Sequence, residues 1–144
     1  MNDKDPILAV MAGYKQAVYE KNVEAFLALY DESVTVFDMW GPQWVCQGIR
    51  AWGEMARDWL GSLGSERVVV EFDDLQVRQT LEMATVTAYV TYTAVSGDGT
   101  TLRSLQNRMT CTLEKRSGPW LITHEHTSGP IDHNTLKASL RRSP

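Results

Sequence analysis

Four long segments rich in β-branched and aromatic residues fill the second half of this chain, and they limit its possible folds more than any other feature. They span residues 67–79, 83–95, 102–114 and 120–128, and short turns rich in Gly, Pro or polar residues separate them. Consecutive strands joined by short turns pair in meander order, which predicts an antiparallel sheet. Runs of about a dozen residues are roughly twice the usual strand length, so this sheet must twist and curl strongly.

The first half of the chain has helical spacing in three places. Apolar residues recur at three- and four-residue intervals over 6–21, 23–30 and 52–63, and a short alternating segment at 34–38 predicts a strand between the last two. In the later sheet region, Asp73 and Asp74 interrupt the alternation between Phe72 and Leu75, which predicts a bulge. Three N-terminal helices packed on a strongly curved antiparallel sheet give an α+β fold, a cone-shaped α+β barrel.

Length and charge bound the class of protein. The 144 residues are 43% hydrophobic, enough for one domain with its own core, and we place it at residues 1–130 with a peripheral C-terminal tail at 131–144. The net charge of −4 provides no positive field for phosphates, so no nucleic-acid partner is expected. The chain begins with a polar segment and has no long apolar run, which predicts no membrane association and a cytoplasmic location.

The cysteines and histidines do not form a recognisable metal motif. Cys46 and Cys111 lack the spacing of metal ligands and are interpreted as reduced core thiols. His124 and His126 lie on one face of the last strand, about 7 Å apart, close enough to share one metal ion. Because no third ligand is placed by spacing, we expect neither a metal nor another cofactor.

The last segment, 120–128, has functional groups on both faces. Period-two alternation places Trp120, Ile122, His124 and His126 on one face and Leu121, Thr123, Glu125 and Thr127 on the other. One face should line a site and the other should meet a partner. A change of parity by one residue would exchange the two faces.

Several local features together resemble the nuclear transport factor 2-like superfamily, in particular its ketosteroid-isomerase-like and polyketide-cyclase-like branch. These are Tyr14 in the first helix, the segment 24–30 with its acidic turn, the strand 34–38, Gly48 before the third helix, and the segment 120–128. The resemblance extends roughly from Asp5 to Ser128. It specifies the fold better than the activity, because one scaffold can host many sites.

The resemblance implies two catalytic residues. Asp38 falls where the ketosteroid isomerases have their base, and Tyr14 falls where they have an oxyanion donor. The acid–base roles of these groups in ketosteroid isomerase are established. A carboxylate beside apolar rings gains basicity, and a phenol can donate to a developing enolate. The third member, an acid in the interior of the third long strand (105–113), is missing, so the donor is absent or is replaced by Asn107, Thr110 or another group. Structural roles for Asp38, at a turn, and Tyr14, in the core, remain the alternative.

The same resemblance assigns the two faces of the last strand. Thr123, Glu125 and Thr127 should face the cone, with Glu125 and Thr127 as ligand-binding candidates. The other face, with Trp120, Ile122, His124 and His126, should form the contact of a homodimer.

Further ligand-binding candidates are aromatic or cationic. Trp40 and Trp44 flank the expected mouth of the cone, and Trp59 in the third helix joins them, with core packing as its alternative. Arg108 lies in the middle of a strand. It is either a solvated or dimer-contact cation, or it turns inward to pair with Glu125, Asp38 or a substrate carboxylate.

Two functions fit these residues. The first is an isomerase or cyclase that binds a small hydrophobic molecule and transfers a proton next to a carbonyl, with Asp38 as base and Tyr14 as donor. The second is a non-catalytic ligand-binding or dimerisation/association domain of the same superfamily. The sequence leaves open whether the protein is an enzyme.

Overall fold

Helices and strands follow one another along residues 4–143, which are the residues that this computed structural model describes. The elements are α1 (Asp5–Glu20), α2 (Val23–Leu27), β1 (Tyr30–Phe37), β2 (Cys46–Gln47), α3 (Gly48–Gly61), β3 (Arg67–Gln79), β4 (Met83–Val95), β5 (Thr101–Lys115) and β6 (Trp120–Ser128). The predicted bounds of β3, β4 and β6 are confirmed. Residues 1–3 and 144, at the outer ends of the predicted domain and tail, lie outside the described residues.

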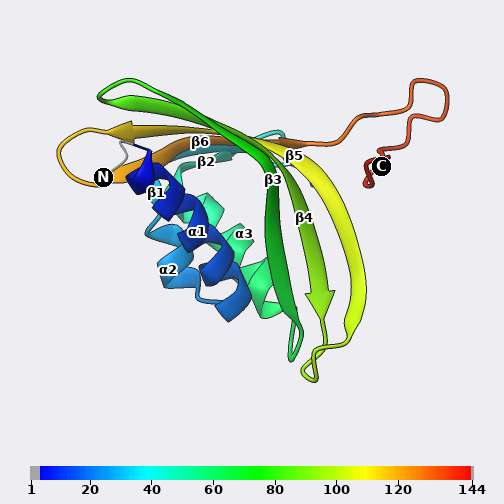
Figure 1. Cartoon of the computed structure of the whole chain (residues 1–144). Coiled ribbons are helices and arrows are strands. Elements are labelled where there is room, and N and C mark those ends of the chain that lie inside the picture. Colours follow the sequence, from blue (N-terminus) through cyan, green and yellow to red (C-terminus); the bar gives the residue numbers. More distant parts are fainter. Residues whose placement is uncertain (1–3, 144) are drawn as a thin grey trace.

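The strands form one mixed sheet that curves around the three helices (Figure 1). Its order is β2-β1-β6-β5-β4-β3, and the meander from β3 to β6 is antiparallel as predicted. The α+β class is confirmed. Two details are corrected: β1 runs parallel to β6, with Val36 opposite Glu125, and the sheet is curved but not closed into a barrel.

The register shifts in four strand pairs of the sheet, and two of these shifts interrupt the alternation of β3 and β6. The predicted one is confirmed: the register of β3 against β4 shifts between Asp73 and Gln76, and Asp74 adopts a positive φ of 51°. The other lies where β5 meets β6, because Leu113 pairs with Ile122 whereas Thr112 pairs with His124. Thr123 is therefore an extra residue in β6, and its hydroxyl donates to the Thr112 carbonyl at 3.3 Å.

The helices cover the concave face of the sheet. The buried stripe of α1, which includes Ile7, Met11 and Val18, packs toward β3, while α3 packs toward β1. The side chain of Asn22 caps α2 by accepting from the Ala25 amide at 3.0 Å. This arrangement encloses a space between the helices and the inner sides of β4, β5 and β6.

The second helix is shorter than predicted. It ends at Leu27, and Tyr30 is already the first residue of β1. The reason is tertiary: the Leu29 carbonyl accepts from the Ile122 amide of β6 at 2.9 Å, so sheet pairing replaces a further helical turn.

The C-terminal segment 129–142, here called the strap, differs from the predicted peripheral tail with a helical patch. Ile131 forms an isolated bridge with Ala138, so the strap leaves the sheet, doubles back and returns to β5, where the Gln106 amide donates to the Leu140 carbonyl at 2.7 Å. Figure 1 shows the doubled part projecting from the body of the protein.

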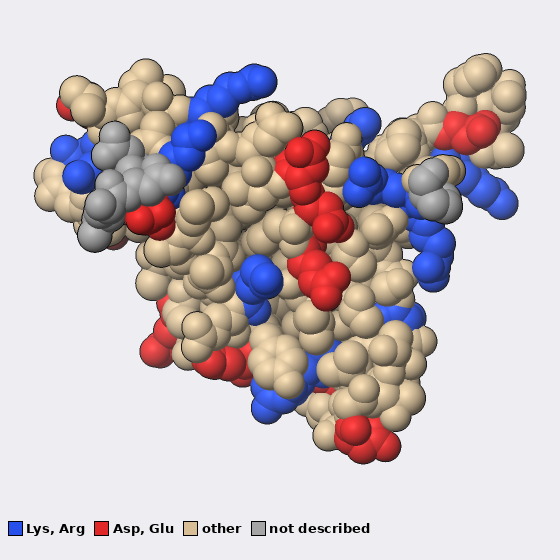
Figure 2. All heavy atoms as spheres, in the orientation of Figure 1, with Lys and Arg blue, Asp and Glu red and all other residues tan. Residues whose placement is uncertain are grey.

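The exposed edge strand β3 carries negative charge. Figure 2 shows a row of acidic side chains along it, and Glu71, Asp73 and Asp74 are exposed there. Charges on an edge strand oppose pairing with a strand of another molecule.

No helix among residues 4–143 combines the length and apolar character needed to cross a membrane.

Candidate active site

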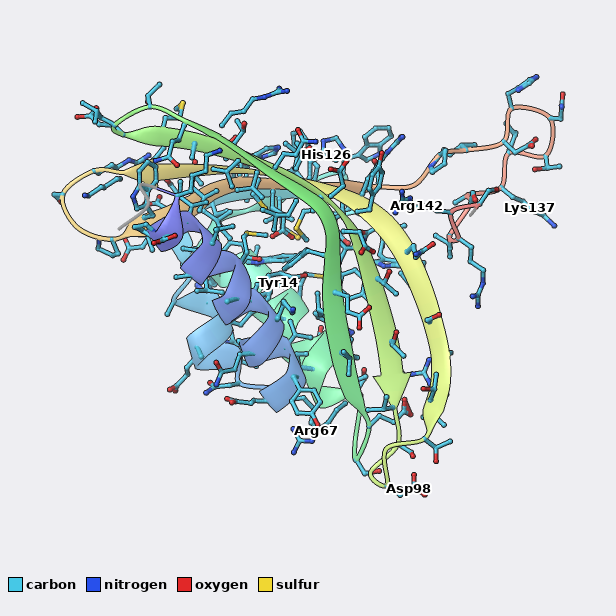
Figure 3. The ribbon with its side chains drawn as sticks, in the orientation of Figure 1. Tyr14, Arg67, Asp98, His126, Lys137 and Arg142 are labelled. Atoms are coloured by element: carbon cyan, nitrogen blue, oxygen red, sulfur yellow. The ribbon has the colours of Figure 1, made fainter. Side chains whose placement is uncertain are left out.

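A cavity of about 600 Å³ lies between the helices and the concave face of the sheet. Its walls are mostly apolar, with the rings of Phe26, Trp52 and Trp59 among them. Figure 3 shows Tyr14 on the side of α1 that faces the sheet. An apolar cavity with a few polar groups is the usual form of a small-molecule site.

Asp38 follows the last residue of β1 and lies at this cavity. Its Oδ2 accepts from the Trp40 amide at 3.3 Å, and its Oδ1 accepts from the Thr127 hydroxyl at 3.3 Å. Burial raises the pKa of Asp38, and these two hydrogen bonds oppose the rise. Asp38 is therefore a stronger base than an exposed carboxylate.

Two phenols meet across the cavity. The hydroxyls of Tyr14 in α1 and Tyr92 in β4 lie 2.9 Å apart, and either can be the donor. Burial is the main cause that raises the pKa of both, and their mutual contact raises that of Tyr14 further. Both stay protonated at neutral pH, so the pair retains a proton to donate to a ligand.

A buried carboxyl lies behind the phenols. Glu125 is 1% exposed, and its Oε1 accepts from the Tyr30 hydroxyl at 2.6 Å. Burial raises the pKa of Glu125 from 4.5 to about 7; the Tyr30 bond lowers it and the charge of Asp38 raises it. Glu125 therefore titrates near neutral pH, and its protonation depends on that of Asp38.

Asn107 lies in β5, the strand in which the resemblance implies a third catalytic group. It is 8% exposed and lines the cavity, and its Nδ2 donates to the Met39 sulfur at 3.3 Å. Its amide also lies close enough to lower the pKa of Tyr92. Within the described part of the chain, its Oδ1 is buried without a hydrogen-bond partner.

Most of the predicted site residues come together in this cavity. The residues from the sequence analysis that line it are Tyr14, Asp38, Trp40, Trp59, Asn107, Glu125 and Thr127. Trp40 is 52% exposed, which places it at the opening. Thr127 connects Asp38 to the sheet through its hydrogen bond with the carboxyl.

Two predicted ligand-binding residues lie elsewhere. Trp44 is 93% exposed in the loop before β2 and does not line the cavity. Arg108 faces outward, and its Nε donates to the Ser128 hydroxyl at 2.8 Å. It keeps the parity of the outer face of β5, so Arg108 does not turn inward, and of the two alternatives the outward one, a solvated or dimer-contact cation, is observed.

Two of the four residues that were predicted to lie on the outer face of β6 lie in the core instead. Trp120 is 9% exposed and Ile122 is 0% exposed, and both belong to the core of the chain itself. The cause is the extra residue Thr123, which reverses the alternation so that Ile122 and Glu125 point to the same side. His124 and His126 remain outside, and Figure 3 shows His126 on the side of the sheet away from Tyr14.

The outer histidines form an aromatic cluster with Phe37. The Phe37 ring lies 4.8 Å from the His124 ring and 5.5 Å from the His126 ring, centre to centre. His124 Nδ1 lies 2.8 Å from the Thr35 hydroxyl. Among residues 4–143 no cluster of three or more His, Cys, Asp or Glu side chains could hold a metal ion.

The sequence analysis missed two phenols of the site. Tyr92 could have been found, because alternation from Val90 in β4 places it on the inner face. Tyr30 could not, since helical spacing assigned it to the end of α2 and only its pairing with β6 turns it toward Glu125.

The fold and the site define a member of the nuclear transport factor 2-like superfamily: three helices on a curved sheet that enclose an apolar cavity with a few polar groups. A family model described as a SnoaL-like domain matches residues 7–132. The chain belongs to this SnoaL-like family, on the polyketide-cyclase side of the superfamily. No curated protein sequence matches it significantly.

Solved structures share the fold at low sequence identity. An NTF2-like protein of unknown function from Pseudomonas putida KT2440 is 23% identical with a TM-score of 0.84, covering 98% of this chain and 96% of that one. A proposed scytalone dehydratase from Novosphingobium aromaticivorans DSM 12444 is 16% identical with a TM-score of 0.75, covering 99% and 95%. A proposed calcium/calmodulin-dependent protein kinase II association domain from Xanthomonas campestris is 19% identical with a TM-score of 0.74, covering 89% and 88%. The same scaffold thus occurs in proteins described as an enzyme and as an association domain.

Proposed function

We propose that this protein is an acid–base enzyme that transfers a proton next to the carbonyl of a small hydrophobic molecule, as an isomerase or a cyclase. One observation carries the proposal: a carboxyl of raised pKa, Asp38, and a protonated phenol, Tyr14, line the same apolar cavity. A base and a donor on the walls of one poorly hydrated pocket are what enolisation requires.

Asp38 takes the proton from the carbon next to the carbonyl, and the electron pair of that C–H bond moves onto the carbonyl oxygen. Tyr14 stabilises the resulting enolate by a hydrogen bond, while Tyr92 holds the Tyr14 hydroxyl in place at 2.9 Å. Return of the proton to another carbon completes an isomerisation. Attack of the enolate carbon on a second carbonyl, with the proton going to the new alkoxide, completes a cyclisation.

Glu125 supports this chemistry as a second titrating group. It lies on the same face of β6 as Thr127, which bonds Asp38, and the two carboxyls influence each other's ionisation. When Asp38 gains a proton its negative charge disappears, and Glu125 then ionises more readily. Two carboxyls with different pKa values in one cavity allow a proton to be taken and held during one reaction.

The test is proton exchange. A panel of apolar ketones and enones in heavy water should exchange their α-protons in the presence of the protein, and Asp38→Asn should lower the rate by about 100-fold or more at nearly constant side-chain volume. Asp58→Asn is the matched control, because Asp58 also lines the cavity but is exposed on α3. It should keep the wild-type rate.

Equal exchange rates for wild type and Asp38→Asn would rule out Asp38 as the base. Saturable binding of the same ketones without any exchange would instead identify a non-catalytic ligand-binding member of the family. Binding is read from quenching of tryptophan fluorescence, since Trp52 and Trp59 line the cavity.

We also propose that two copies associate through the outer face of the sheet around His124 and His126. The supporting observation is the cluster of these rings with Phe37, which is 43% exposed in the single chain. Aromatic groups at a half-covered surface are typical of the centre of an interface. A cytoplasmic location is part of the proposal, supported by Cys46 and Cys111, which are both buried and unpaired.

A further inference from the structure

The strap is fastened to β5 by two hydrogen bonds and to β4 by one cation–π contact, and none of these involves its projecting part. The Gln106 amide donates to the Leu140 carbonyl, and the Arg142 amide donates to the Gln106 side-chain oxygen, both at 2.7 Å. The Arg142 guanidinium also lies 3.6 Å from the centre of the Tyr89 ring. Figure 3 shows Arg142 close to the body of the protein and Lys137 out on the projecting part. The end of the strap therefore has a defined place on the sheet.

Leu140 is the point where the strap enters the body of the protein. From residue 130 to residue 142 it is the one residue that is not exposed. A Cβ placed on Gly129 would lie 2.9 Å from the Ser139 carbonyl oxygen, 3.8 Å from Met39 Cε and 3.9 Å from Leu140 Cδ2. The strap and Met39 thus meet at Gly129, where only a residue without a side chain fits.

Met39 connects the contact at Gly129 to the site through hydrogen bonds. Its amide donates to the Thr127 hydroxyl at 3.0 Å, and that hydroxyl donates to Asp38 Oδ1 at 3.3 Å. Its sulfur accepts from Asn107 Nδ2 at 3.3 Å. Met39 is also the next residue after Asp38, so any displacement of Met39 moves the backbone that carries the carboxyl.

We propose that the strap is a positioning element of the active site, in which Leu140 holds Met39 in place and Met39 in turn holds Asp38 against Thr127. The inference rests on the proposed role of Asp38 as the base, and it adds that the segment 129–142 sets the position and the hydration of this base. Neither Leu140 nor Met39 lines the cavity, so both act through Asp38 rather than on the substrate.

Leu140→Ala tests the strap, with Leu136→Ala as its matched control. Leu136 belongs to the same strap but is 77% exposed on the projecting part, so its truncation removes little buried surface. The main readout is the titration of Asp38, followed by NMR of its side-chain carboxyl carbon in the full-length protein. The titratable groups facing Asp38 are Glu125, Tyr92 and Cys46, and each of them is unchanged in both variants.

In Leu140→Ala we expect the pKa of Asp38 to fall toward its ordinary value, because water reaches the carboxyl when Met39 loosens. The exchange rate should fall between about 10- and 100-fold, mainly in kcat, because the base is misplaced while the apolar walls still bind the ketone. Leu136→Ala should match wild type in both measurements. An unchanged Asp38 titration in folded Leu140→Ala would overturn the proposal.

Gly129→Ala provides a second variant if Leu140→Ala does not fold. The added methyl group must push the Ser139 carbonyl away, which displaces the strap and keeps every side chain of the site. It should shift the titration of Asp38 in the same direction, and no shift would overturn the proposal as well. The titration of Asp38 needs no substrate. It therefore tests the role of the strap even if the exchange assay shows that the protein does not catalyse proton exchange.

Discussion

The inner and outer faces of β6 carry similar polar groups in very different surroundings. Glu125 and Thr127 on the inner face are 1% and 4% exposed, whereas His126 on the outer face is exposed. The inner carboxyl accepts a hydrogen bond from a buried phenol, and burial moves its pKa to about 7. The outer imidazoles pack on Phe37 and remain within reach of solvent.

This difference shows how one strand can serve two purposes. In the cavity, loss of hydration changes the acid–base properties of a carboxyl, which is useful for chemistry. On the outer face, water remains available, and the rings of Phe37 and the two histidines form the surface through which we propose that two copies associate. The bulge at Thr123 separates the two uses, because it sets which side chains go inside.

The largest effect on stability should come from Ile122, which was predicted on the outer face of β6 but lies in the core. Ile122→Ala removes a fully buried side chain, and we expect it to lower the free energy of unfolding by about 2–5 kcal/mol. His126→Ala on the outer face should change it by less than about 0.5 kcal/mol. Urea unfolding at several protein concentrations measures both. If the two losses were similar, Ile122 would belong to the outer face after all.

A smaller effect should appear in the pH dependence of stability. The pKa of Glu125 rises from 4.5 to about 7 on folding. The folded state therefore binds the proton more tightly, and stability that is present below about pH 4.5 is lost as the pH rises through 7. Each pKa unit is worth about 1.4 kcal/mol, so this loss amounts to at most about 3 to 4 kcal/mol.

Glu125→Gln should remove that loss, since an amide keeps the shape of the side chain and does not ionise. Urea midpoints at pH 5 and pH 8 should then differ less in the variant than in wild type. Glu71→Gln, which changes an exposed glutamate of β3, is the control and should keep the wild-type difference. A full wild-type difference in Glu125→Gln would show that Glu125 does not titrate in this range.

The smallest effect concerns association through the outer face. His126→Asp should weaken self-association by about 10-fold, because it places a carboxylate without a partner in a desolvated contact. The stability of the single chain should hardly change. Sedimentation over a range of concentrations measures this, with His133→Asp on the exposed strap as control. Identical molar masses for wild type and His126→Asp at every concentration would exclude this face as the interface.

Local patterns predicted much of the fold and of the site. The bounds of β3, β4 and β6 and the bulge at Asp73 follow from alternation and its interruption, which a few neighbouring residues determine. Tyr14 and Asp38 were brought together by the resemblance to known isomerases, and the structure places both on one cavity. Trp44 lies outside the cavity because its exposure depends on how the loop before β2 packs, and the sequence left open whether Arg108 faces inward or outward.

By itself, the sequence determined the α+β class, the long strands and the absence of a positive field, since composition and periodicity act within each segment. The tertiary structure alone decided which side of β6 faces the cavity, that Tyr30 leaves its helix to bond Glu125, and that Leu140 of the strap packs near Met39. The physical reason is that register, burial and pKa depend on partners far apart in the chain. Those partners meet only after β1 and the strap have joined the sheet.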